Sequence, residues 1–199
     1  GETQIMYGLR GERRLTEWEV DWLPGYAASK PVRVGNAAHQ QFQLDVYGEV
    51  MDAFEQSRKG GLAATEEGWE LQRALVDHVC EVWKEPDNGI WETRGPKQHF
   101  VYSKAMAWVC FDRAIKAVEQ YGLKGPVDKW HEVRDAIHAE VCDKGFDSKR
   151  NSFRAAYDSD LLDASLLLLG QTGFVKPDDP RFVGTVEAIE KDLLADGFV

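Results

Sequence analysis

The sequence has no hydrophobic run of transmembrane length, no basic cluster longer than Arg13-Arg14, and neither a Cys-x-x-Cys nor a His-x-x-x-His pair. The first absence argues against a membrane-spanning helix, and no signal-peptide pattern opens the chain. Nucleic-acid-binding domains need a basic stripe, whereas this chain has 34 acidic against 24 basic residues and a net charge of −10. We therefore expect neither nucleic acid nor a membrane as a partner. Because the cysteine and histidine pairs typical of metal sites are also missing, we expect no metal, and we expect no other cofactor.

Cysteine is also scarce. Cys80, Cys110 and Cys142 are odd in number, widely spaced and placed in apolar helical stretches. Such cysteines are typical of small buried side chains in a reducing compartment. We therefore expect a cytoplasmic protein. No exact internal repeat is present, which disfavours a solenoid.

Hydrophobic residues make up 43% of the 199 residues and aromatic residues 11%. This is enough for one sizeable core, so we expect a single domain over residues 1–199. Residues 1–36 are expected to form an extended and loop lead-in, with a strand or two after Arg14. The seven tryptophans either pack in the core or stack on the apolar face of a sugar.

Hydrophobic spacing predicts six helices after this lead-in. They cover about residues 37–57, 65–84, 100–121, 127–142, 160–170 and 179–195. The first, third and fifth are apolar nearly all round, whereas the second, fourth and sixth carry one apolar face. A helix that is apolar all round must be buried on every side, and a one-faced helix lies at a surface. The alternation predicts an all-α fold of three inner/outer helix pairs in concentric layers.

The connections that lead into the inner helices are the elaborate ones. They span residues 31–36, 85–99 and 143–159, and the last contains a predicted small hairpin over 146–153. In a layered array all three must emerge at the same end. Long aromatic and charged loops at one end of a rigid scaffold usually form the binding site.

The second connection carries the most informative motif. Residues 87–89 (Asp-Asn-Gly) predict a turn, which presents Glu92 beside Ile90 and Trp91. An apolar wall favours the protonated carboxyl that a general acid needs near neutral pH. Arg94 would oppose this effect if it contacted Glu92, and it could equally pair with Asp87 or donate to a sugar hydroxyl. The structural alternative is a loop glutamate in an ion pair with Arg94.

Four separated segments resemble glycoside hydrolase family 15, which holds glucoamylases, glucodextranases and certain bacterial trehalases. Residues 88–92 (Asn-Gly-Ile-Trp-Glu) are similar to the family's acid loop, with Glu92 at the general-acid position and Trp91 before it. Residues 31–38, 99–108 and 162–169 are similar to the family's inner helices or to the turns that lead into them. The resemblance follows the chain in order over essentially its whole length.

This resemblance implies an (α/α)6 toroid with a pocket at one end, and hydrolysis of α-linked glucosides with inversion at the anomeric carbon. Six helices are half of twelve, so we expect half of an (α/α)6 toroid. The family's substrate-clamping Arg-Asp pair lies earlier and its base glutamate later, and neither is found here. We therefore expect an internal fragment of a longer enzyme, with the base outside the chain and negligible turnover by the chain alone.

The resemblance also bears on the substrate. Some family members carry a second carboxylate directly after the acid, where this sequence has Thr93. This departure favours a trehalase-like over a glucoamylase-like site. The candidate substrate-binding residues are Trp91, Arg94, Arg33, Asn36, Tyr157 and Asp158. Structural alternatives are a helix cap for Asn36, an ion pair for Arg33, and an N-cap role for Asp158 or Asp160.

Two other functions are compatible with the pattern. A non-catalytic scaffold of helical pairs that binds a protein or carbohydrate would have one-faced helices throughout. A different toroid enzyme, such as an epimerase, would place paired histidines in the cavity, for which His39 and His99 are the candidates. In a half-toroid, by contrast, the inner helices lack part of their neighbours. We therefore expect a homodimer, or closure of a smaller assembly, through the exposed apolar faces.

Overall fold

The computed structural model describes residues 3–199, and the chain divides into two compact units between Gln43 and Leu44. The boundary lies close to the end of the lead-in that the sequence predicts over residues 1–36. The single domain expected over residues 1–199 stays a prediction.

The first unit is largely extended, as expected. Its strands β1 (Trp18–Glu19) and β2 (Arg33–Val34) pair antiparallel, with Trp18 opposite Val34. Two short 3-10 helices accompany them, η1 (Tyr26–Ala28) and η2 (Ala37–Gln40). The prediction that an α-helix begins at residue 37 is wrong. The Asn36 side chain accepts a hydrogen bond from the Ala38 N–H at 2.9 Å and starts only the short η2, after which the backbone is extended at Gln41.

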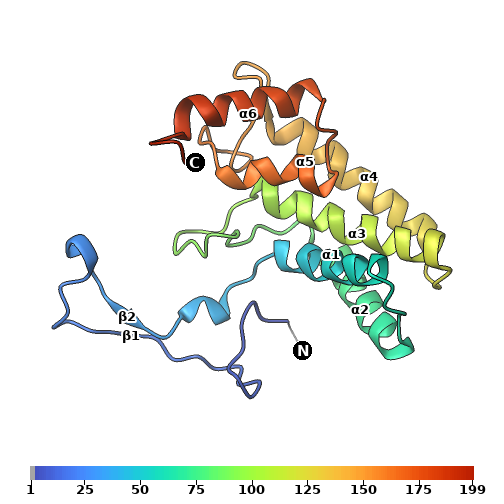
Figure 1. The fold of residues 1–199 in the computed structure, drawn as a ribbon, viewed down its shortest axis with the longest axis horizontal. Coiled ribbons are helices and arrows are strands. Elements are labelled where there is room, and N and C mark those ends of the chain that lie inside the picture. The colour runs from blue at the N-terminus through green and yellow to red at the C-terminus, as the bar shows by residue number, and fades with distance from the viewer. Residues whose placement is uncertain (1–2) are drawn as a thin grey trace. The chain divides into compact units, whose positions relative to one another are not determined.

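The second unit contains the helices (Figure 1). They are α1 (Asp45–Lys59), α2 (Glu66–Val82), α3 (Val101–Tyr121), α4 (Val127–Lys144), the short η3 (Ala164–Leu167) and α5 (Leu168–Thr172), and α6 (Pro180–Leu193). Local chemistry sets several of these ends. Thr65 caps α2, Asp179 caps α6 with Pro180 in its first turn, and Gly122 ends α3 in the left-handed conformation.

Helix α3 lies at the centre of this unit. It packs against α1, α2, α4 and α5, and 15 of its 21 residues are buried (Figure 1). The sequence predicted this helix to be surrounded, and the structure confirms it. A scaffold of helices that are one-faced throughout does not have such a member.

The structure confirms that α2 and α4 each bury one face, although the residues on that face differ in part from those expected. On α4 the buried stripe includes Trp130, Ile137 and Val141, as expected. On α2 the face differs, since Leu71 is 54% exposed whereas Gln72 is buried. The reason is polar, because the Gln72 side chain accepts a hydrogen bond from Arg58 at 2.8 Å and donates one to the Gly68 carbonyl.

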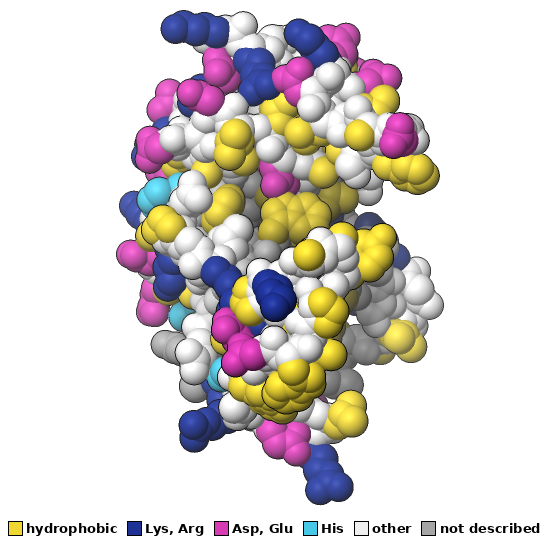
Figure 2. Space-filling model, turned by 90° about the vertical axis from the view of Figure 1, so that its left-hand side faces the viewer, with side chains coloured by type: hydrophobic (Ala, Val, Ile, Leu, Met, Phe, Trp, Pro, Cys, Tyr) yellow, Lys and Arg dark blue, Asp and Glu magenta, His cyan; other side chains and the backbone are white. Residues whose placement is uncertain are grey.

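The first and third inner helices differ from expectation. Helix α1 is buried on one side only, because in the second unit its helical neighbours are α2 and α3. The helix expected from residue 160 begins at 164 as η3, because Asp163 and not Asp158 or Asp160 is its N-cap, accepting from the Ser165 N–H at 2.8 Å. Leu161 therefore lies outside the helix and is 71% exposed. Figure 2 shows hydrophobic side chains gathered in patches on one face of the molecule.

The hairpin predicted over residues 146–153 is confirmed. Its strands β3 (Phe146–Asp147) and β4 (Ser152–Phe153) pair antiparallel, and α6 packs on β4. Across residues 3–199, none of the helices combines the length and the apolar character that a membrane span requires.

Candidate active site

The acid turn, defined here as residues 87–98, is a closed loop that precedes α3. Its two ends pair antiparallel, since Asp87 and Gln98 exchange two backbone hydrogen bonds of 2.9 Å each. Inside the loop the Glu92 N–H donates to the Gly89 carbonyl at 3.3 Å, and the Thr93 hydroxyl donates to the Asn88 carbonyl at 2.7 Å. The predicted turn is therefore present, with Glu92 within it.

Two residues of the acid turn have left-handed backbone conformations. Gly89 has φ 70°, and a Cβ atom at this position would lie 2.8 Å from the Phe100 ring, so only glycine fits. Glu92 has φ 51°, which is uncommon for a residue with a side chain. Such backbone strain concentrates at functional sites. It sets the direction in which the half-buried Glu92 side chain leaves the loop.

Buried charges hold the base of the acid turn. The fully buried Asp87 carboxylate accepts a hydrogen bond from the Leu44 N–H at 2.9 Å, which ties the turn to the start of α1. The equally buried Lys104 ammonium, on α3, donates to the carbonyls of Trp83 and, at 2.6 Å, Glu85. Burial raises the pKa of Asp87 and lowers the pKa of Lys104 to about 8. The turn is therefore anchored on two inner helices.

The second and third connections meet at one end of α3, as predicted. The Val101 N–H donates to the Ala155 carbonyl at 3.0 Å, and the Tyr157 N–H donates to the His99 carbonyl at 3.1 Å. The Trp91 indole N–H donates to the Asp163 carboxylate at 2.7 Å. The acid turn is thus fixed to the segment that enters η3. The first connection, residues 31–36, belongs to the other unit.

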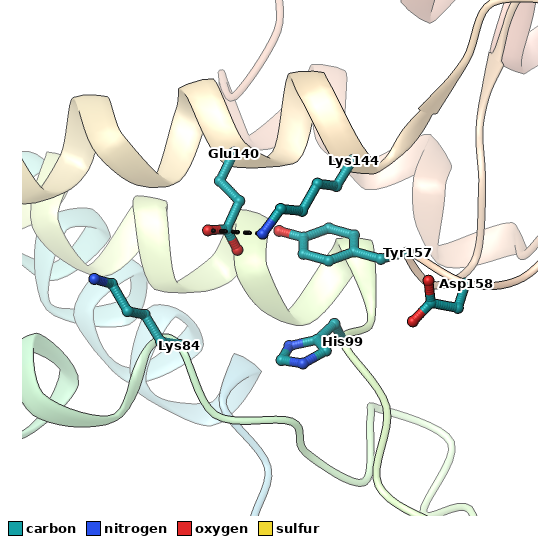
Figure 3. A pocket seen from close by; sticks show the side chains of 6 residues that line it. All are labelled: Lys84, His99, Glu140, Lys144, Tyr157 and Asp158. Atoms are coloured by element: carbon teal, nitrogen blue, oxygen red, sulfur yellow. Dashed lines mark ion pairs between the residues drawn. The ribbon is translucent and has the colours of Figure 1, made fainter.

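The structure separates the predicted site residues into groups. Glu92, Trp91 and Arg94 lie on the acid turn, where the Trp91 ring is 60% exposed and Arg94 is exposed. Tyr157 and Asp158 instead line a separate cavity of about 600 Å³, here called the polar pocket (Figure 3). Its lining residues are Lys84, His99, Glu140, Lys144, Tyr157 and Asp158. None of the three acid-turn candidates is among them.

Arg33 and Asn36 have the structural roles that the sequence offered as alternatives to sugar binding, an ion pair for Arg33 and a helix cap for Asn36. Arg33 forms ion pairs with Glu17 at 3.3 Å and Glu19 at 3.0 Å across the β1–β2 ribbon. Asn36 caps η2. A contact of either side chain with a sugar stays a prediction.

Sequence reasoning missed Asp163, Lys104 and Asp45. Asp163 was readable as a cap, since it stands two residues before Ser165 at a helix start. Lys104 was readable as the one cation in the apolar first half of its helix, residues 101–111. Asp45 gave no signal, and burial beside Asp87 raises its pKa to about 7. Within the part of the chain that the structure describes, no three His, Cys, Asp or Glu side chains are grouped so that they could hold a metal ion.

Comparison with known proteins agrees with this geometry. Residues 2–199 match the family described as glycosyl hydrolases family 15. A trehalase of Mycobacterium tuberculosis is 43% identical over 196 residues, which are 98% of this chain and 29% of that protein. A trehalase of Thermoplasma volcanium is 38% identical and covers 98% of this chain, which matches 31% of its length. The chain therefore spans about a third or less of these relatives.

A solved structure supports the fold. The structure titled "Glycosidase E335A in complex with glucose" superposes with a TM-score of 0.70 at 22% identity, covering 88% of this chain and 48% of that one. The observed inner/outer helix pairs are therefore half of an (α/α)6 toroid. On the sequence match over almost its entire length, the chain belongs to glycosyl hydrolases family 15.

Proposed function

We propose that this chain is the segment of an inverting α-glucosidase that supplies the general acid, Glu92. The observation that carries the proposal is a carboxylic acid on a closed, strained turn that is anchored to two inner helices. In the reaction Glu92 gives its proton to the glycosidic oxygen as the bond from that oxygen to the anomeric carbon breaks. Water attacks the same carbon from the opposite face and loses a proton to a base.

The base is a second carboxylate that we place in the part of the enzyme outside this chain. Inversion requires the two carboxyl groups to lie roughly 6.5–9.5 Å apart, so that the water fits between them. The curated relatives are more than three times as long as the matched segment, which leaves room for it. The chain by itself is therefore proposed to be inactive.

We propose trehalose as the substrate. The relatives described above are trehalases, and Thr93 stands where a second carboxylate would indicate a glucoamylase-like site. Trp91 is proposed to stack on a glucosyl ring, because Asp163 fixes its indole N–H at 2.7 Å and leaves the ring exposed. Arg94 would donate to sugar hydroxyls beside it.

The proposal is tested in a complete barrel. Residues 2–199 replace the matching segment of the M. tuberculosis trehalase, and trehalose hydrolysis is measured for this chimera and its Glu92→Gln variant. Loss of a general acid lowers kcat by about 10²–10⁴-fold. An exposed glutamate on α2 gives the matched control, Glu81→Gln, which should keep full activity. A Glu92→Gln chimera that hydrolyses trehalose at the original rate rejects the assignment.

We further propose a cytoplasmic location and a homodimer of the isolated chain. Cys80, Cys110 and Cys142 are all free thiols, as a reducing compartment allows. Apolar side chains of the inner layer, among them Trp108 and Leu168, are only partly buried, and a second copy would cover them. Light scattering of the purified chain should give the dimer mass. A monodisperse monomer would count against association.

A further inference from the structure

The polar pocket is built entirely within the second unit and stands apart from the acid turn. Lys84 follows α2, Glu140 and Lys144 lie on α4, and Tyr157 and Asp158 belong to the third connection (Figure 3). Its volume of about 600 Å³ lies within the range typical of small-molecule sites.

His99 Nδ1 is shielded from solvent and has no hydrogen-bond partner within residues 3–199. The Tyr157 hydroxyl is equally shielded, and its interaction is with the Glu140 carboxylate. Tyr157 is only 9% exposed, and its ring stacks on His99 with centroids 5.6 Å apart and planes 12° from parallel. A buried polar group without a partner costs about 1–3 kcal/mol. A bound ligand that supplied hydroxyl groups would remove this cost.

The charged side chains that line the polar pocket indicate which class of ligand it could bind. Lys84 and Lys144 balance Glu140 and Asp158, and burial lowers the pKa of His99, which leaves that ring neutral near pH 7. The pocket is therefore electrically balanced and offers ammonium donors beside carboxylate acceptors. Lys144 and Glu140 lie 3.4 Å apart, so one hydroxyl group can accept from the first and donate to the second.

We infer that the polar pocket is an accessory binding site for a neutral polyhydroxylated ligand, a glucosyl unit of an α-glucoside. A strongly anionic or cationic ligand would face carboxylates or ammonium groups of its own sign. The polyol chemistry follows from the pocket, whereas the choice of a glucoside rests on the proposed function. The site would hold a sugar apart from the acid turn, without taking part in the bond cleavage.

Binding is tested on the 199-residue chain itself, without hydrolysis. Trehalose and methyl α-D-glucoside are titrated into the isotope-labelled protein, and amide shifts are followed by NMR. We expect weak saturable binding, with shifts centred on residues 99, 140–144 and 157. Tyr157→Phe removes only the hydroxyl group and should weaken binding at least fivefold without changing the fold.

Glu92→Gln separates this site from the acid turn. Binding that persists in this variant and is lost in Tyr157→Phe supports the inference. No saturable sugar binding, equal affinity in Tyr157→Phe, or shifts confined to residues 87–98 would overturn it. A negative result here leaves the hydrolysis assay of the chimera unaffected, and a failed hydrolysis assay leaves this titration interpretable.

Discussion

Single buried charges decide how the acid turn is held. Asp45 is 3% exposed and lies near Asp87, and its burial, with the repulsion between the two carboxylates, raises its pKa to about 7 from 3.8. The folded state thus binds this proton more tightly than the unfolded state. Below about pH 4 both states hold the proton, and the stability that Asp45 contributes is lost as the pH rises toward 7.

Asp45→Asn should therefore stabilise the chain at neutral and alkaline pH. At pH 8 the gain in the free energy of unfolding should be about 2–4 kcal/mol, whereas at pH 4 it should nearly vanish. Thermal or urea unfolding of both proteins across this range measures the difference. Asp77→Asn, which changes an exposed aspartate on α2, should show no such trend. A constant difference for Asp45→Asn at all pH values would contradict the account.

Lys104 allows a second prediction at this scale. Lys104→Met leaves the buried carbonyls of Trp83 and Glu85 without their donor, so the free energy of unfolding should fall by about 2–4 kcal/mol. Hydrogen exchange in residues 84–98 should accelerate more than exchange in α4. The exposed Lys129→Met is the matched control. Unchanged exchange in this stretch would show that Lys104 does not hold the acid turn.

At the scale of helices and strands, the sequence predicted most of what the structure contains. Periodicity placed α2, α3, α4 and α6 within a few residues of their ends, and the hairpin of β3 and β4 was readable from its turn residues. The errors arise where a polar contact of a side chain overrides the hydrophobic pattern. Gln72 is buried because Arg58 binds it, and η3 starts late because Asp163 caps it. Neither partner can be identified from hydrophobic spacing.

The candidate site was predictable in part, since the sequence predicted the acid turn but not the polar pocket. The closed acid turn followed from Asp-Asn-Gly and from the family resemblance of its Trp-Glu pair. The placement of Tyr157 with His99 in a separate pocket did not follow, because it depends on a backbone hydrogen bond between these two residues, which are 58 residues apart in sequence. Backbone pairing of this kind leaves no periodic signal.

Gly48 tests how closely the inner helices pack. A Cβ atom here would lie 2.2 Å from the Met106 carbonyl oxygen, so Gly48→Ala must push α1 and α3 apart. We expect a loss of about 1–3 kcal/mol in unfolding free energy despite the better helix propensity of alanine. Gly95→Ala, where the added methyl group meets open space, should be neutral. Urea denaturation that finds both variants equally stable would contradict this packing.

At the scale of the whole molecule, the chain is a half-toroid, and we propose that it supplies one of the two carboxyl groups that hydrolysis requires. We predict that the 199-residue chain releases no glucose from trehalose above the buffer control, because the water-activating base is proposed to lie outside this chain. A sensitive coupled glucose assay on purified protein measures this. Glucose release that the Glu92→Gln variant abolishes would show instead that the base lies within residues 1–199.

We propose that Glu92 protonates the leaving group. A general acid is needed for a poor leaving group such as glucose, and hardly at all for fluoride, which departs without a proton. The most direct measurement compares trehalose with α-D-glucosyl fluoride in the chimera, with and without Glu92→Gln. The account predicts a loss of about 10²–10⁴-fold on trehalose and a far smaller loss on the fluoride. Equal losses on both substrates, or none on trehalose, would contradict it.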